Sequence, residues 1–180
     1  MSVSAPLPDP GLPLGVLGSD SIRRLLEGPE PLIEGLRDAD AQIQPNGVDL
    51  TLEHIWQFTS GGIIGGSAPG RRLPTRTPVA GPADGWYRLA PGGYLVTLHE
   101  VLHMPGHLMA LAPPRSTLLR CGAHLYGAVI DAGYVGRLEA LLTVFNPDGL
   151  TLAVDAAMCQ IAFFPLSESV AGYRGFYQGT

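Results

Sequence analysis

The chain has 180 residues, a formal net charge of −5 and a hydrophobic fraction of 46%. This length is enough for one domain with its own core, so we expect a single domain over residues 1–180. The acidic balance excludes a broad basic surface for nucleic acid, and no apolar run approaches the roughly 20 residues of a membrane-spanning helix, so we expect neither nucleic acid nor a membrane as a partner.

The N-terminal stretch MSVSAPLPDPGLPLG lacks a basic start and an apolar core followed by a cleavage site. A signal peptide is therefore disfavoured, and we expect a cytoplasmic protein. The next stretch, GSDSIRRLLEG, predicts a short helix over residues 18–28. Ser19 or Asp20 can cap this helix, aliphatic residues recur at helical spacing, and Gly28 and Pro29 end it.

The stretch IQPNGVDLTLEHIWQF turns at residues 45–47 and then alternates apolar and polar side chains from Val48 to Ile55, with one irregularity. This pattern is typical of a β-strand that contains a bulge. Between residues 60 and 85 the chain is rich in Gly, Pro, Ser and Thr, and its periodicity fails. We expect a long loop there.

From residue 86 onward, short apolar runs recur between turns rich in Pro and Gly. The runs are YLVTLHEVLHM, HLMALA, HLYGAVI, RLEALLTVFN, LTLAV and AMCQIAFFPL. Many short strands at close spacing indicate an all-β barrel or sandwich. The last residues, 167–180, are rich in Gly and aromatic side chains and are too polar for a core strand.

The histidines and cysteines do not form an evident metal site. His99, His103 and His107 recur at every fourth residue, which would align three metal ligands on a helix. The segment has the pattern of a strand and a turn, so we expect these histidines to scatter. Cys121 and Cys159 are isolated from each other, which fits neither a disulfide framework nor a zinc site.

Two polar positions are more suggestive. Arg115 and Ser116 follow a proline turn in PPRSTLLRCG, where a guanidinium and a hydroxyl can reach a phosphate together, although such a pair is usually a surface turn. Asp131 follows the apolar residues 128–130, which predict burial nearby, and a buried carboxylate needs a partner or a task. Alternatively, Asp131 caps the turn that Gly133 makes.

Five stretches, in this order, resemble the successive motifs of the dUTPase and dCTP deaminase superfamily: PNGVDLTL, PPRSTLLRCG, GAVIDAGYVGR, DAAMCQIAFF and GYRGFYQG. The resemblance covers residues 19–178 and is closest to archaeal-type dUTPases. It implies a distorted jelly-roll β-barrel with a short N-terminal helix. It also implies a homotrimer with active sites between subunits and a C-terminal tail that closes over bound nucleotide.

Members of this superfamily hydrolyse dUTP to dUMP and pyrophosphate, deaminate dCTP, or do both. Deaminases carry a glutamate three residues before an Asn, and counting back from Asn146 places Thr143 there. Glu139 lies on the same face of the predicted strand but about 13 Å away, too far to replace that glutamate without a register change. The stretch GRLEALLTVFNP is similar to the archaeal-type dUTPase pattern, although Leu138 stands where that pattern often has Gly.

We therefore expect a dUTP diphosphatase. One alternative is a dCTP deaminase, or a bifunctional enzyme, that uses Glu139 through a shifted register. Another is a nucleotide-binding module of the same fold without turnover. Arg120 is a secondary candidate that does not separate the branches, because both carry a second Arg in this motif.

The resemblance also implies roles for individual residues. Asp131 would be the general base that deprotonates a water for attack on the α-phosphorus. Tyr134 would pack beneath the deoxyribose and exclude ribonucleotides. The backbone around Tyr126 and Gly127 would bind the uracil edge.

The remaining roles concern the triphosphate and the tail. Mg²⁺ would be the cofactor, chelated mainly by the triphosphate, with Asp49 acting through ordered water. The other expected ligands are Arg115, Ser116 and Gln160 for phosphate oxygens, Arg174 of the tail for the phosphates, and Phe176 or Tyr177 as the cover of the base.

Overall fold

The computed structural model of the chain describes residues 15–66 and 68–179. Residues 1–14, on which the expectation of no signal peptide rests, lie outside this part. The helical elements are α1 (Ser19–Leu26), α2 (Ala39–Gln42), the 3₁₀ helix η1 (Ala68–Gly70) and α3 (Ser116–Arg120). The strands are β1 (Ile33–Glu34), β2 (Ile43–Gln44), β3 (Gly47–Phe58), β4 (Arg76–Pro78), β5 (Trp86–Leu89), β6 (Gly92–His103), β7 (Leu108–Leu111), β8 (Ala123–Tyr126), β9 (Val135–Val144), β10 (Leu150–Ala153) and β11 (Ala157–Pro165).

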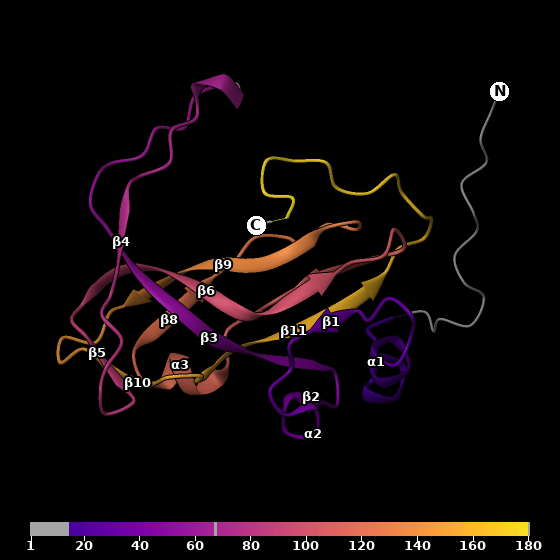
Figure 1. Cartoon of the computed structure of the whole chain (residues 1–180), viewed down its shortest axis with the longest axis horizontal. Coiled ribbons are helices and arrows are strands. Elements are labelled where there is room, and N and C mark those ends of the chain that lie inside the picture. The colour runs from indigo at the N-terminus through magenta and orange to yellow at the C-terminus, as the bar shows by residue number, and fades with distance from the viewer. Residues whose placement is uncertain (1–14, 67, 180) are drawn as a thin grey trace.

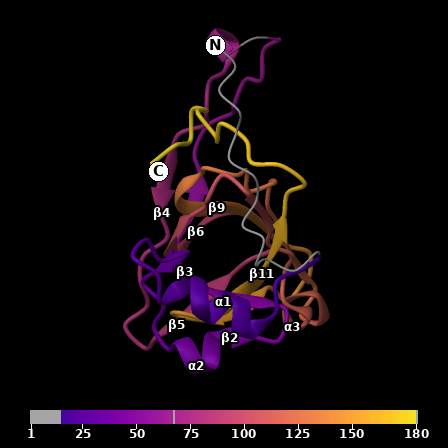
Figure 2. The same cartoon turned by 90° about the vertical axis from the view of Figure 1, so that its right-hand side faces the viewer.

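Most strands belong to one curled sheet in which β3 and β6 are central (Figure 1). In the described part of the chain this sheet has nine strands, and six of them follow the order β7-β11-β3-β6-β9-β8. β1 pairs with β6, β2 and β4 pair with β3, and β5 pairs separately with β10. Seen from one end, the strands curl round a common interior (Figure 2). The predicted all-β, jelly-roll-like fold is confirmed.

Alternating burial along β6 and nearly continuous burial of the first half of β3 build the core. In β6 the even-numbered residues from Val96 to Leu102 are buried, whereas their neighbours are partly exposed. β3 shows the predicted irregularity as a bulge between Leu52 and His54, where its pairing with β6 shifts register. The largest fully buried side chains are Phe163, Leu17, Ile22, Leu50, Leu52, Ile55, Leu98, Leu102, Leu108, Leu142, Met158 and Ile161.

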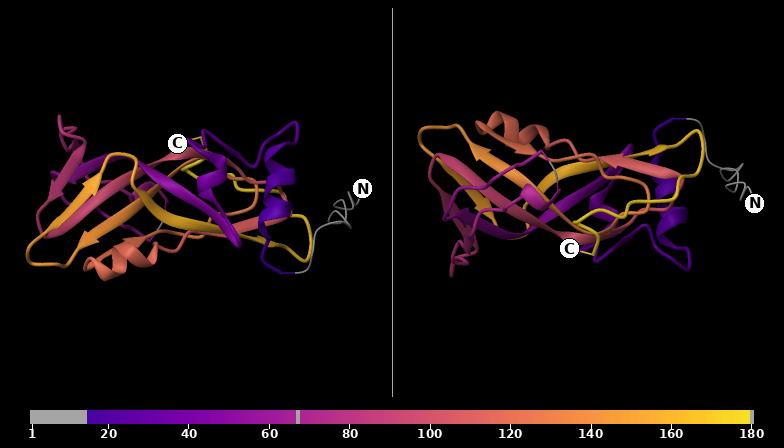
Figure 3. Two further views of the ribbon diagram at one scale, coloured as in Figure 1. Left: turned by 90° about the horizontal axis from the view of Figure 1, so that it is seen from below. Right: turned by 90° about the horizontal axis from the view of Figure 1, so that it is seen from above.

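Helix α1 lies across one end of the strands (Figure 3) and is held by its apolar face. Ile22 is fully buried, and its backbone N–H donates to the carbonyl of Gly18, which is the N-cap residue. The prediction that Ser19 or Asp20 caps the helix is wrong. Both residues already lie in the first turn, so their side chains cannot take the cap position.

The region predicted as a long loop contains a paired arm, defined here as residues 59–66 and 68–75. The backbone N–H of Thr59 donates to the carbonyl of Thr75 at 2.9 Å, and Ile63 and Arg72 exchange backbone hydrogen bonds of 2.7 and 2.9 Å. The arm projects from the barrel (Figure 1), and its described residues are largely exposed on both faces. No core selects an apolar face there, which explains why the sequence loses its periodicity.

Two other predictions need correction. The run HLYGAVI predicts a strand through Ile130, but β8 ends at Tyr126, and Ile130 rejoins the sheet only through a bridge to Ala110. The stretch PPRSTLLRCG contains α3 rather than a turn alone. In the part of the chain that the structure describes, no helix is long and apolar enough to cross a membrane.

Candidate functional site

Asp131 begins a tight turn that the end of β6 holds in place. The Tyr134 N–H donates to the Asp131 carbonyl at 3.2 Å, and Gly133 has a φ of +79°, which favours glycine. Met104 brackets the turn, because its carbonyl accepts from Gly133 at 2.9 Å and its N–H donates to Tyr134 at 2.8 Å. The backbone of the turn is therefore fixed, and with it the point from which the Asp131 side chain projects.

The Asp131 side chain is exposed, and the expected burial of its neighbours is only partly correct. Ile130 is buried, but Ala128 is exposed and Val129 is 55% exposed. Within residues 15–66 and 68–179, the Asp131 carboxylate has no recorded hydrogen bond or ion pair. Its oxygens are thus available to accept a hydrogen bond from a water or a ligand.

Asp131 opens onto a cavity of about 660 Å³, which we call the turn cavity. The strands, the turn, the arm and the tail (residues 167–179) all contribute to its lining. Five residues selected from the sequence line it: Gly127, Asp131, Tyr134, Glu139 and Tyr177. Arg76 and Arg137 also line it, and neither cation was selected as a candidate site residue from the sequence.

Tyr134 and Tyr126, both assigned to the nucleoside, have different surroundings. Tyr134 is buried, its hydroxyl donates to the carbonyl of Arg137 at 2.6 Å, and its ring meets Tyr173 edge to face. A ring fixed in this way presents a rigid wall to the turn cavity. Tyr126 is half-exposed, stacks on His124 and does not line that cavity.

A second cavity, of about 570 Å³, collects the residues assigned to phosphate and metal. We call it the cleft. Asp49 of β3 pairs in register with Gln160 of β11, and the N–H of Arg115 donates to Met158 of β11. Ser116 follows Arg115 at the start of α3, so both line the cleft beside Asp49 and Gln160. Residues from three separate parts of the sequence thus converge through the pairing of β3 with β11 and the hydrogen bond of Arg115 to β11.

Asp49 and Arg115 form an ion pair at the floor of the cleft. Asp49 is only 4% exposed, and its carboxylate lies 3.0 Å from a guanidinium nitrogen of Arg115. Burial raises the pKa of Asp49, and the positive charge of Arg115 opposes this rise. Beside the pair, Arg120 donates to the Ser116 hydroxyl at 3.1 Å but does not itself line the cleft.

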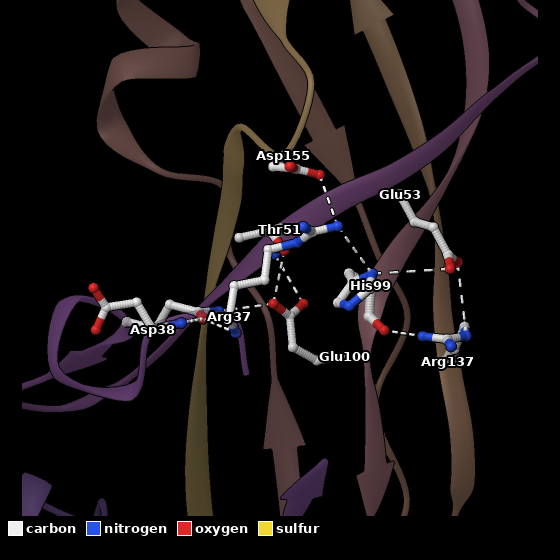
Figure 4. A network of polar contacts seen from close by, with 9 residues as sticks. Arg37, Asp38, Thr51, Glu53, His99, Glu100, Arg137 and Asp155 are labelled. Atoms are coloured by element: carbon white, nitrogen blue, oxygen red, sulfur yellow. Dashed lines mark hydrogen bonds and ion pairs between the residues drawn. The ribbon is translucent and has the colours of Figure 1, made fainter. Parts of the chain in front are cut away.

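A fully buried carboxylate, Glu100, contacts the same strand as Asp49 and was missed from the sequence (Figure 4). It accepts hydrogen bonds from the Gln42 amide at 2.7 Å and from the Thr51 N–H and hydroxyl at 2.9 and 2.8 Å. The same Gln42 amide donates to the backbone carbonyl of Asp49. This network fixes the stretch of β3 that carries Asp49.

His99 is surrounded by charges from four other segments (Figure 4). Its Nδ1 lies 3.3 Å from Arg37 and 3.9 Å from Glu53, and its carbonyl accepts from Arg137. Arg37 in turn pairs with Asp155 at 2.8 Å. Within the described residues, no three His, Cys, Asp or Glu side chains come together in a way that could hold a metal ion.

Glu139, the alternative proton carrier, is engaged by another residue. Its carboxylate lies 2.5 Å from Arg76 of β4, and the Arg76 guanidinium stacks over Trp56 at 4.8 Å. β9 pairs with β6 without interruption from Glu139 to Thr143, so both lie on one face at their expected spacing. No register shift brings Glu139 to the position of Thr143.

The tail packs directly on the Asp131 turn. The Tyr173 N–H donates to Ala132, the Gln178 side chain bonds to the backbones of Gly133 and Val135, and Gly179 donates to Val135. A Cβ on Gly133 would lie 2.5 Å from the Cα of Gly172, so the contact requires glycine. Tyr177 lines the turn cavity, whereas the predicted ligands Arg174 and Phe176 line neither the turn cavity nor the cleft.

Comparison with known proteins shows which family the chain is similar to. The model of the family described as "dCTP deaminase-like" matches residues 16–166. A "probable deoxyuridine 5'-triphosphate nucleotidohydrolase" of Methanococcoides burtonii is 44% identical over 164 residues, 91% of this chain and 96% of the relative. The chain belongs to the dCTP deaminase-like family.

Other members of the family extend the comparison. The probable deoxyuridine 5'-triphosphate nucleotidohydrolase of Archaeoglobus fulgidus is 40% identical over 92% of this chain and 97% of its own. The deoxyuridine 5'-triphosphate nucleotidohydrolase of Methanocaldococcus jannaschii is 37% identical over 78% of this chain and 89% of its own. The solved structure of 2'-deoxycytidine 5'-triphosphate deaminase from Agrobacterium tumefaciens superposes with a TM-score of 0.61 at 24% identity, over 83% of this chain and 48% of that one, which supports the fold.

Proposed function

We propose that the protein hydrolyses dUTP to dUMP and pyrophosphate. The observation that carries this proposal is the similarity, over nearly the whole of both chains, to relatives named deoxyuridine 5'-triphosphate nucleotidohydrolase. The Asp131 carboxylate, which has no partner among the described residues and stands on a fixed turn, supports it, because a general base must be held within reach of a water. In the proposed reaction that water attacks the α-phosphorus, its proton passes to Asp131, and the bond to the bridging oxygen of the pyrophosphate breaks.

The two cavities divide the substrate between them. The turn cavity offers Tyr134 as a wall for the deoxyribose and the backbone at Gly127 for the base. The cleft offers Arg115, Ser116 and Gln160 to phosphate oxygens. Tyr126, Arg174 and the two tail aromatics remain proposed substrate contacts.

Because the two sets of residues line separate cavities of one chain, we propose that a complete site forms between copies. The Asp131 turn of one subunit would then face the cleft of another, as in the expected homotrimer. If each site takes its Asp131 turn from one copy and its cleft from another, at least two copies of the chain are needed for each site.

Mg²⁺ fits this chemistry as an ion that arrives with the triphosphate. The described residues hold no cluster of three ligands, and Mg²⁺ commonly keeps waters and binds substrate phosphates. Asp49 is the carboxylate in the cleft that would contact the ion through water. When bound, the ion would neutralise charge on the phosphates during attack.

dCTP deamination is the second candidate function, since the family description names it and Glu139 lines the turn cavity. The ion pair of Glu139 with Arg76 argues against it, because the guanidinium occupies the carboxylate that would have to reach the cytosine ring. A nucleotide-binding module without turnover is a third candidate.

Product analysis with dUTP and dCTP side by side, in the presence of Mg²⁺, tests these candidates. We expect dUMP and pyrophosphate from dUTP and no ammonia from dCTP. Asp131→Asn should bind dUTP but turn it over about 10²–10⁴-fold more slowly. Asp148→Asn, at an exposed turn acid that lines neither cavity, is the matched control.

Each alternative has its own outcome. Wild-type protein that binds dUTP without releasing pyrophosphate would be a binding module. Ammonia release from dCTP that disappears in Glu139→Gln would identify a deaminase. Normal turnover in Asp131→Asn with lower stability would make Asp131 a structural turn residue.

A further inference from the structure

The arm is an ordered, hydrogen-bonded element that lies on the same side of the barrel as the tail. Its two limbs are joined by the Ile63 and Arg72 hydrogen bonds, and near its base the Ser60 hydroxyl bonds to Thr75. Figures 1 and 2 show the arm and the tail on the same side of the barrel. The arm is therefore in position to act on the segment that packs over the Asp131 turn.

The arm and the tail line the same cavity. Leu73 and Pro74 of the arm line the turn cavity together with Tyr173 and Tyr177 of the tail, and Asp131 lies in that lining too. A ligand in this cavity would touch both segments. Any contact that fixes the arm to the tail would consequently fix two walls of the proposed nucleoside site relative to each other.

Arg71 makes that contact. Its guanidinium lies 5.3 Å from the ring centroid of Phe176 and 5.7 Å from that of Tyr177. The two rings meet edge to face at 5.1 Å, so one cation faces a preformed aromatic pair. Phe176 is otherwise 68% exposed, and Arg71 has no recorded acidic partner among the described residues. A guanidinium over aromatic faces is attracted by their negative charge density.

Beyond the aromatic pair, the tail is anchored a second time. Gln178 donates to the carbonyl of Gly133 at 3.1 Å and accepts from Val135 at 3.3 Å, and Gly179 donates to Val135 at 2.8 Å. The aromatic pair thus lies next to a fixed attachment at the turn and under Arg71. Without Arg71, the two cation–π contacts that join this aromatic pair to the arm would be lost.

We propose that Arg71 is a positioning residue that holds the tail aromatic pair in place and thereby keeps Tyr177 in the lining of the turn cavity, so that the arm and the tail close the site as one unit. This role rests on the proposed function, since the closed site is the one assigned to dUTP. Arg71 itself acts through Phe176 and Tyr177.

Hydrogen–deuterium exchange of the tail tests the contact without any activity. Arg71→Ala should speed exchange of the tail peptide by about two- to fivefold, the range expected of an exposed cation–π contact. Arg71→Lys should restore part of the protection, because an ammonium keeps the charge. Arg72→Ala is the matched control, since Arg72 is the adjacent arm residue and has no recorded tail contact within the described part of the chain. Peptides from β9 serve as the internal reference.

The second readout is kinetic. With dUTP, Arg71→Ala should raise KM by about the same two- to fivefold factor with a smaller change in kcat, because the contact positions the cover and not the reacting atoms. α,β-Imido-dUTP should slow tail exchange in wild type more than in Arg71→Ala. Tail exchange and KM in Arg71→Ala equal to those of Arg72→Ala would overturn the proposal. If the wild type fails to hydrolyse dUTP, exchange without nucleotide still decides whether Arg71 holds the tail.

Discussion

Replacing Glu100 by Gln tests whether its buried network with Gln42 and Thr51 is as fully paired as the structure describes. The two side chains have nearly the same shape, so the change removes a charge and converts one acceptor oxygen into a donor. One carboxylate oxygen accepts from the Thr51 N–H, and the other accepts from the Thr51 hydroxyl and the Gln42 amide. Whichever oxygen is replaced by the new NH₂ group, that group faces a hydrogen-bond donor, either the Thr51 N–H or the Gln42 amide.

The network has little freedom to adapt. Gln42 cannot turn its amide over, because its oxygen already accepts from the N–H groups of Arg37 and Asp38 at 2.7 and 3.0 Å. At least one buried donor stays unpaired in Glu100→Gln, which costs about 1–3 kcal/mol of unfolding free energy. Glu100→Ala removes the three hydrogen bonds and leaves a void, so we expect a larger loss of about 3–5 kcal/mol.

Equilibrium urea unfolding at a fixed protomer concentration measures both losses, since self-association would otherwise change the apparent stability. Glu30→Gln, the same chemical change at an exposed residue, is the control and should lie within about 0.5 kcal/mol of wild type. If Glu100→Gln is as stable as Glu30→Gln, the donor conflict does not exist and the pairing described for Glu100 is incorrect.

Two further predictions follow from local geometry. In the native protein the exposed Cys121 should react with a thiol reagent, whereas the buried Cys159 should react only after unfolding. Burial and the nearby carboxylates Glu100 and Asp49 raise the pKa of Cys159 to about 12. Equal labelling of both thiols in the native protein would contradict this. Gly133→Ala should release the tail and lower dUTP turnover, while Gly85→Ala should not. The two glycines have φ values of +79° and +80°, but only a Cβ at Gly133 would meet Gly172. Hydrogen–deuterium exchange of the tail and dUTP turnover compare the two variants, and equal effects would mean that backbone strain alone is responsible.

Much of the fold could be predicted because its signals are local. The alternation in β3 and β6, the Pro45-Asn46 turn and the Gly133 turn each depend on residues close together in sequence. The bulge in β3 was visible as a break in alternation. The arm was not, because both of its faces meet solvent and no apolar face marks its pairing.

Glu100 shows why part of the site could not be predicted. Within β6 it occupies an inward position between Leu98 and Leu102, where a carboxylate conflicts with the apolar pattern. Its partners are Thr51 and Gln42, which lie 49 and 58 residues away in the sequence. Because these hydrogen-bond donors are so far from Glu100 in the sequence, nothing near Glu100 in the sequence indicates that its buried carboxylate is paired.

The sequence by itself determined the all-β fold class, the family motifs and the residue types available for chemistry, because strand alternation, turn glycines and motif order depend on short stretches. Only the tertiary structure decided which of these residues share a cavity. Asp49 meets Gln160 through the pairing of β3 with β11, while Asp131 lies in the other cavity, under the arm and the tail. The curl of the sheet and its long-range strand pairing set these distances, and neither depends on neighbours in sequence.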